Sequence, residues 1–196
     1  MKTIIYVVRH GITAMNASGK IQGRSDIPLS EEGFSQARKA HGYFKDKDIA
    51  RVYPSPLVRA VQTAETIVKG KNIELIVEPR VVERDFGNFE GTPMPKVFME
   101  DIFDEDTPGY TGERRAATAQ RMYDALCDLG EKNLGKEIIV VSHGNAIGCL
   151  LRKLNSDLYY QKKKDGTFLI KNCSTAEFEY ENGKLSLISW PHGEYL

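Results

Sequence analysis

Short apolar runs recur along this chain, and stretches of mixed polarity separate them. Four segments have the pattern of strands, and they lie at 4–8, 51–53, 73–77 and 138–141. A fifth segment, 176–190, is divided by Asn182-Gly183, a dipeptide that favours a tight hairpin turn. The pattern therefore predicts a set of buried strands followed by a C-terminal antiparallel hairpin.

The stretches between the strands carry helix signals. Helices are predicted over 30–44, 54–70, 113–131 and 145–154. The hydroxyl of Ser30 suits an N-cap, and the second helix has Pro56 at its start and Gly70 after its end. Strands that alternate with helices predict a three-layer α/β/α sandwich on a mostly parallel sheet, with the hairpin as an antiparallel edge.

The length of 196 residues suits a single domain spanning 1–196. The polar stretch 11–28 has the size of a functional loop. A second irregular stretch, rich in Gly, Pro and acids, predicts a short lid-like insertion around 92–112. We find no linker that would divide the chain into two domains.

Composition removes several classes of function. The 27 basic residues balance 27 acidic ones, which argues against a general attraction to nucleic acid or to an anionic membrane. No apolar run approaches the ~20 residues of a membrane span, and the N-terminus lacks the features of a signal peptide. Three widely spaced cysteines fit reduced thiols and a cytoplasmic location.

Two strands end on the same dipeptide. His10-Gly11 follows the first strand, and His143-Gly144 follows the strand at 138–141 and leads into a helix. Ligands of open parallel sheets bind outside the carboxyl ends of the strands, so both histidines can face one anion-sized pocket. A structural role is the alternative for any single strand-end histidine. A metal site is a second alternative, but His41 and His192 lack ligand spacing, and we predict no metal.

Three further charged residues fit an anion pocket. Arg9 adjoins the first histidine, and Arg59 lies one turn inside a predicted helix, where its guanidinium can reach a phosphate. Glu83 follows a strand in a Gly-containing loop, where a carboxyl group can act as an acid or base. Taken alone, each of these residues could equally be an exposed surface group.

Seven motifs occur in an order that we recognise. They are VVRHGITAMN, QGRSDIPLSEEG, SPLVRAVQTAE, ERDFGNFEG, GER, VVSHGNAIG and NCSTAEFEY. Together they span nearly the whole chain, and the sequence resembles the histidine phosphatase superfamily, the phosphoglycerate mutase-like proteins.

The resemblance implies a role for each matching residue. His10 is similar to the nucleophile that becomes phosphohistidine, and Glu83 to the acid that protonates the leaving oxygen and then activates water. Arg9, Arg59 and a protonated His143 match the clamp around the phosphoryl group, with no cofactor. The matching substrate-binding positions are Asn16, Gln22, Gly23, Arg84 and Gly144.

The family contains phosphatases and cofactor-dependent mutases, and we favour the phosphatase branch acting on a small phosphorylated metabolite. Mutases are usually longer in the region of 92–112, and they have Tyr and Lys where this chain has Phe86 and Met94. Arg114-Arg115 offers a partial substitute for that lysine. A binding module that has lost catalysis is a further alternative, although all five catalytic positions are kept.

Other departures leave the substrate open. Ile12, Arg114 and Asn145 stand where many family members have Glu, Ser and Gly. The acidic segment 100–107 is either a charged lid or a solvated loop. Lys162–Lys164 is expected to be a solvated turn rather than a phosphate collar, and a homodimer through an edge strand is left open.

Overall fold

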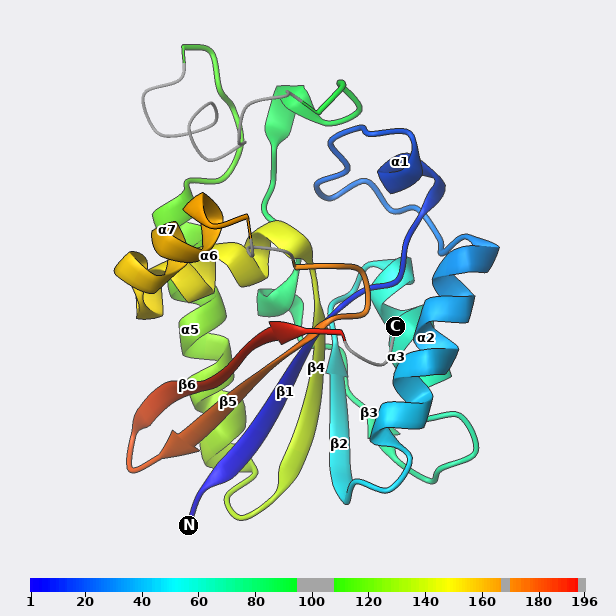
Figure 1. The fold of residues 1–196 in the computed structure, drawn as a ribbon, viewed down its shortest axis with the longest axis vertical. Helices are drawn as coiled ribbons and strands as arrows, with labels where there is room; N and C mark the ends of the chain where they lie inside the picture. Colours follow the sequence, from blue (N-terminus) through cyan, green and yellow to red (C-terminus); the bar gives the residue numbers. More distant parts are fainter. Residues whose placement is uncertain (95–107, 167–169, 194–196) are drawn as a thin grey trace.

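A six-stranded sheet forms the centre of the molecule (Figure 1). The computed structural model describes residues 1–94, 108–166 and 170–193. Within them the strands are β1 (Thr3–Arg9), β2 (Ile49–Pro54), β3 (Glu74–Leu75), β4 (Glu137–Ser142), β5 (Thr175–Glu181) and β6 (Lys184–His192). Their order across the sheet is β3-β2-β4-β1-β5-β6. The acidic segment 100–107 and most of the predicted insertion at 92–112 lie outside the described residues.

The sheet is mixed in the predicted way. β3, β2, β4 and β1 pair in parallel, whereas β5 pairs antiparallel with both β1 and β6. The hairpin turns at Asn182 and Gly183, whose φ angles are 51° and 79°. The predicted α/β sandwich with an antiparallel edge is therefore confirmed.

Helices cover both faces of the sheet. The α-helices are α1 (Ala14–Ala17), α2 (Glu31–Phe44), α3 (Val58–Ile67), α5 (Arg115–Lys132), α6 (Gly144–Leu154) and α7 (Ser156–Lys164). Two short 3-10 helices, η1 (Pro79–Val81) and η2 (Gly87–Phe89), lie between β3 and α5. Figure 1 shows α2 and α3 on one side of the sheet and α5, α6 and α7 on the other.

The two faces explain why β1 is apolar along its whole length. Ile5 and Val7 belong to the core beneath α5 and α6, while Tyr6 and Val8 belong to the core beneath α2 and α3. A central strand with both faces buried has no polar side to show. The same reasoning applies to β4, its parallel neighbour.

The structure differs from the sequence predictions at three places. The strand predicted at 73–77 is reduced to the two residues of β3. The loop at 11–28 contains α1, which Thr13 and Asn16 close with a capping box. Lys162–Lys164 belongs to the last turn of α7 rather than to a separate turn, and its side chains are half-buried or exposed. In α7 only Tyr159 is buried, which leaves no apolar periodicity to read.

The described helices include none with the length and apolar character that a bilayer crossing requires.

Candidate active site

The two predicted histidines lie side by side. Arg9 pairs with Ser142 at the ends of β1 and β4, so the next residues, His10 and His143, leave the sheet together. Their ring centroids are 5.1 Å apart, and both side chains are buried, with 2% and 0% exposed. The site therefore lies at the carboxyl ends of the central parallel strands, at the top of the sheet in Figure 1.

His10 is held in one orientation. Its Nδ1 lies 2.7 Å from the carbonyl oxygen of Gly11, which can only accept, so Nδ1 carries the hydrogen and Nε2 keeps its lone pair. Burial, and then the charges of Arg9 and Arg59, lower the pKa of His10 well below its ordinary value. The imidazole is therefore neutral near pH 7, with a free nitrogen suited to nucleophilic attack.

His143 is bound at one nitrogen only. Its Nε2 lies 2.7 Å from Ser55 Oγ, and its Nδ1 is buried with no hydrogen-bond partner among the described residues. Burial, and then the charge of Arg59, lower the pKa of His143 well below its ordinary value. The resemblance implies a protonated His143 in the phosphate clamp, whereas these surroundings favour the neutral ring. A dianionic ligand beside it would raise its pKa again.

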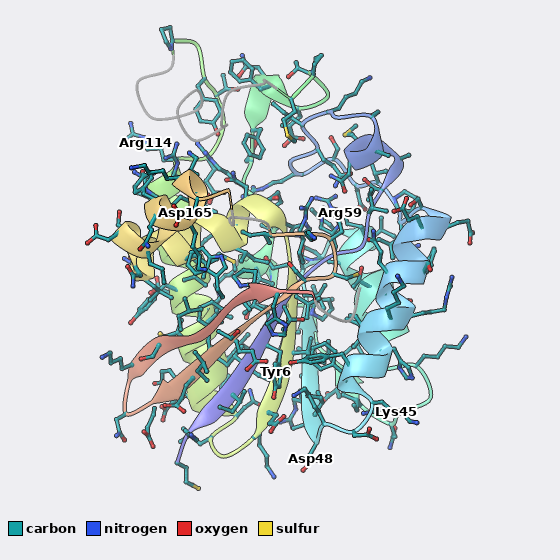
Figure 2. All side chains as sticks on the ribbon, in the orientation of Figure 1. Tyr6, Lys45, Asp48, Arg59, Arg114 and Asp165 are labelled. Carbon is teal, nitrogen blue, oxygen red and sulfur yellow. The ribbon has the colours of Figure 1, made fainter. Side chains whose placement is uncertain are left out.

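Two buried arginines accompany the histidines. Arg59 donates through Nη1 to the Ser25 carbonyl and through Nη2 to the Gly23 carbonyl, both at 2.7 Å. Burial lowers its pKa to about 10. Arg9 donates through Nη1 to the Ile170 carbonyl at 2.6 Å. Figure 2 labels Arg59 at the end of the sheet to which the parallel strands point.

Each member of the predicted clamp keeps one donor position unused. Arg9 Nε and Arg59 Nε, like His143 Nδ1, are buried and have no hydrogen-bond partner in the described part of the chain. A buried donor without an acceptor costs free energy, so such groups are normally paired. Gly144 makes room for Arg9, since a Cβ there would lie 3.2 Å from Nε. Three such donors on the predicted clamp residues are suited to binding an anion.

The side chain of Glu83 lies at the N-terminal end of α6. Its Oε1 accepts hydrogen bonds from the backbone N–H groups of Ala146 and Arg84, at 2.7 and 2.8 Å. Its Oε2 accepts from the Asn145 N–H at 3.1 Å. The carboxyl group is 8% exposed and interacts electrostatically with Arg9 and Arg59. It is therefore held in place beside the histidine pair.

Three of the predicted substrate-binding residues, Asn16, Gln22 and Gly23, lie in the loop whose carbonyl groups accept hydrogen bonds from Arg59. Thr13 Oγ1 lies 2.6 Å from Gln22 Oε1 and 3.2 Å from Asn16 Oδ1. Gly23 has a φ of 51°, and a Cβ there would clash with the carboxyl group of Glu90. That carboxyl group accepts from the N–H groups of Arg24 and Ser25. Asn16, Gln22 and Gly23 are thus parts of one connected loop.

Arg84, another predicted substrate-binding residue, makes its contacts with Glu113, Phe86 and Tyr110. Its Nε donates to the Glu113 carbonyl at 2.8 Å, and its guanidinium lies 5.4 Å and 5.5 Å from the ring centroids of Phe86 and Tyr110. The side chain is fully buried. These contacts place it within the loop that carries Glu83, called the acid loop below, rather than in the clamp around the histidines.

The sequence analysis missed Arg121, which supports the acid loop from α5. Its guanidinium donates to the carbonyls of Arg80, Val82 and Glu83 at 2.7–3.1 Å. It also contacts both oxygens of Glu113, at 2.7 and 2.8 Å. Burial acts to raise the pKa of Glu113, but the hydrogen bonds and charge of Arg121 outweigh it and hold that pKa below its ordinary value. Nothing in the sequence distinguishes Arg121 from a surface arginine.

No group of three or more His, Cys, Asp or Glu side chains in the described ranges is arranged to hold a metal ion.

Comparison with known proteins agrees with this geometry. The sequence profile of the histidine phosphatase superfamily (branch 1) matches residues 5–192. This chain belongs to that superfamily. The probable phosphoglycerate mutase GpmB of Yersinia pestis (strain Pestoides F) is 31% identical over 194 residues, which cover 95% of this chain and 89% of that protein.

Solved structures show the same fold. A phosphoserine phosphatase mutant from Entamoeba histolytica, crystallised with phosphoserine, is 30% identical with a TM-score of 0.80, and the match covers 99% of both chains. The structure of phosphoserine phosphatase from that organism with 3-phosphoglyceric acid has a TM-score of 0.79, at 30% identity and 98% coverage of each chain. Phosphoglycerate mutase from Bacillus anthracis str. Sterne has a TM-score of 0.84 at 24% identity, covering 99% of this chain and 95% of that one.

Proposed function

We propose that this protein hydrolyses phosphomonoesters through a phosphohistidine on His10, without a metal ion. The observation that carries the proposal is the set of three buried nitrogens, on Arg9, Arg59 and His143, that have no partner among the described residues. The His143 ring lies 5.1 Å from the ring of His10, and Arg9 and Arg59 are close enough for their charges to lower the pKa of His10. A dianionic phosphoryl group would satisfy all three donors and lie against the nucleophile.

The reaction then has two steps. His10 Nε2 attacks phosphorus in line, an N–P bond forms, the ester P–O bond breaks, and protonated Glu83 gives its proton to the leaving oxygen. In the second step Glu83 takes a proton from water, the oxygen attacks phosphorus, and the N–P bond breaks to release inorganic phosphate and neutral His10. Arg9, Arg59 and His143 stabilise the charge on the equatorial oxygens in both steps.

The proposed substrate is a small phosphorylated metabolite. Phosphoserine and 3-phosphoglycerate are the first candidates, because relatives at 30% identity were crystallised with these molecules. The three cysteines are free thiols, which supports action in a reducing compartment, the cytoplasm.

A mutase is the second candidate, because the relatives at 31% identity include probable phosphoglycerate mutases. Phe86 and Met94 stand where mutases tend to have polar residues, and a few lost polar contacts can decide specificity. These residues favour hydrolysis over phosphoryl transfer to a second substrate.

The test is phosphate release from an aryl phosphate in EDTA, from mildly acidic to neutral pH, with a His10→Ala control. We expect activity that survives EDTA and is lost in the control, followed by a panel that includes phosphoserine. Phosphoryl exchange between phosphoglycerates without phosphate release would favour the mutase. Binding of phosphate with neither reaction would favour a binding module.

A further inference from the structure

A groove separate from the histidine pair lies between β6, α5 and the junction of α6 with α7. Its volume is about 690 Å³, which is within the range of small-molecule sites. Its lining is mostly apolar and aromatic, with Tyr123 from α5, Leu154 and Leu158 from the junction, and Leu187 and Trp190 from β6. Figure 1 shows β6 at the sheet edge on the side covered by α5, α6 and α7. None of the proposed catalytic residues lines the groove.

All charged residues that line the groove are cationic. They are Lys153 at the end of α6 and Lys184 at the start of β6. An adjoining cavity of about 420 Å³ shares Lys153 and adds Arg115 and Arg152, again without an acid. This local excess of positive charge contrasts with the equal numbers of acids and bases in the whole chain.

Within the described ranges Lys153, Lys184 and Arg152 form no ion pair. Asp124 is engaged by Gln120, whose Nε2 donates to it at 2.8 Å, and it lines neither cavity. An anion in the groove would therefore meet Lys153 and Lys184, neither of which is held in an ion pair by the described residues.

Both aromatic residues of the groove have an ammonium group against the ring. Lys153 Nζ is 5.5 Å from the centroid of Tyr123, and Lys162 Nζ is 5.5 Å from the centroid of Trp190. A planar ligand stacked on either ring would place a negatively charged substituent beside a lysine.

We propose that this groove binds an anionic ligand whose planar, apolar body stacks on Tyr123 and Trp190 and whose acidic group is held by Lys153 and Lys184. The ligand class is an aromatic carboxylate, sulfonate or phosphate. The site is independent of the proposed phosphatase chemistry, and it does not require a reaction at His10.

Three small probes separate charge from shape. Naphthalene-2-sulfonate has the planar body and the charge, neutral naphthalene-2-sulfonamide has the body alone, and inorganic sulfate has the charge alone. Trp190 is the chain's only tryptophan, so its indole N–H gives a single nuclear magnetic resonance signal that reports on the groove. We expect a saturable shift with the sulfonate, binding at least about tenfold weaker with the sulfonamide, and no shift with sulfate.

Matched variants locate the binding. Replacing both lysines by glutamine, Lys153→Gln with Lys184→Gln, should weaken the sulfonate at least about tenfold and leave the sulfonamide unchanged. Both side chains are exposed, so the fold should be retained. Lys39→Gln, an exposed lysine on α2 across the sheet, is the control and should have no effect.

Several outcomes would overturn the proposal. Equal binding of sulfonate and sulfonamide would remove the role of charge, and an absent or unsaturable shift would remove the site. An equal loss in Lys39→Gln would show a general charge effect. Sulfonate binding that disappears in His10→Ala would assign the probe to the histidine pair, whereas unchanged binding in that variant supports the groove whatever the fate of the proposed function.

Discussion

At the scale of single residues, Ser55 favours the tautomer of neutral His143 that can donate a hydrogen bond to a phosphate. Ser55 Oγ accepts a hydrogen bond from the Leu57 N–H at 3.4 Å, and it lies 2.7 Å from His143 Nε2. Its own hydrogen can therefore point to Nε2, which leaves the hydrogen of the neutral ring on Nδ1. That nitrogen is the unused donor of the proposed clamp.

Ser55→Ala should lower kcat/KM for an aryl phosphate roughly 5- to 150-fold, because a buried polar atom without its partner costs about 1–3 kcal/mol. Steady-state kinetics over a pH series is the measurement. Ser142→Ala is the matched control: Ser142 is also fully buried, but its hydroxyl donates to the Val81 carbonyl at 2.8 Å. Equal losses of activity in the two variants would contradict a role for Ser55 in orienting His143.

The depressed pKa values of His10 and His143 make a prediction about stability. Unfolding raises both pKa values to the ordinary value of about 6.5, so below that pH the unfolded chain binds protons that the folded chain does not. The free energy of unfolding should therefore be greatest above pH 6.5. It should fall by up to about 1.4 kcal/mol per pH unit for each histidine as the pH drops toward 5.

Urea unfolding at several pH values between 7.5 and 5 measures this slope. The carboxyl groups of Glu78, Glu113 and Asp128 titrate at lower pH, because their pKa values are held below the ordinary range. His10→Asn with His143→Asn should flatten the slope. An unchanged slope in that double variant would show that other groups bind the protons.

The sequence analysis named the histidine pair because apolar runs show where strands end, and strand ends in a parallel sheet meet at one edge. It missed the roles of Ser55 and Arg121, since their partners lie far away in the chain and their own surroundings carry no pattern. It included Arg84 through the family motif alone, and the hydrogen bond of that side chain to the Glu113 carbonyl has no signal in the sequence. Residue type and spacing indicate chemistry, whereas orientation depends on packing.

At the scale of elements, α2 packs against the loop that follows His10. A Cβ on Gly33 in the first turn of α2 would lie 2.2 Å from the Ile12 carbonyl oxygen, and one on Gly11 would lie 2.6 Å from the Gly33 carbonyl oxygen. Backbone therefore meets backbone, and neither position has space for a side chain. The contact fixes the start of the loop relative to the sheet.

Two glycines of α2 should respond to alanine in opposite directions. Gly33→Ala should destabilise the fold by about 1–3 kcal/mol, because its methyl group meets backbone that must move. Gly42→Ala has nothing within 4 Å of the new Cβ and should stabilise by about 0.5–1 kcal/mol through helix propensity. Denaturant unfolding of both variants is the measurement, and changes of the same sign would refute the close contact.

Long periodic elements were predicted well, and weakly patterned ones were not. α5 buries Met122, Leu126 and Leu129 on one face, as the spacing indicated. α7 was not predicted, because it is stabilised by an Asn155 cap rather than an apolar face. The strand predicted at 73–77 proved shorter, because β3 pairs with β2 through only two residues. Tertiary context decides such short elements.

At the scale of the whole molecule, an anion bound at the proposed site should stabilise the fold. Inorganic phosphate that binds only the folded chain should raise the free energy of unfolding by about 2.7 kcal/mol at a hundred times its Kd. Thermal unfolding with phosphate, compared with sodium chloride at equal ionic strength, measures the effect. His143→Ala should reduce it, and an equal shift with chloride would refute a specific site.

The position of β1 in the sheet has a consequence for when this site comes into being. β1 leads directly into His10, but its neighbours are β4 and β5, which come from the C-terminal half of the chain. A ribosome making this protein would release His10 early and His143 late, so no nascent chain has the pair until synthesis nears its end. Pairing across such sequence separation is also slow to form. Cleavage of the chain between the two histidines would put β1 and β4 in different fragments, and neither fragment contains both strands. The histidine pair therefore forms in a chain that is uncleaved and folded.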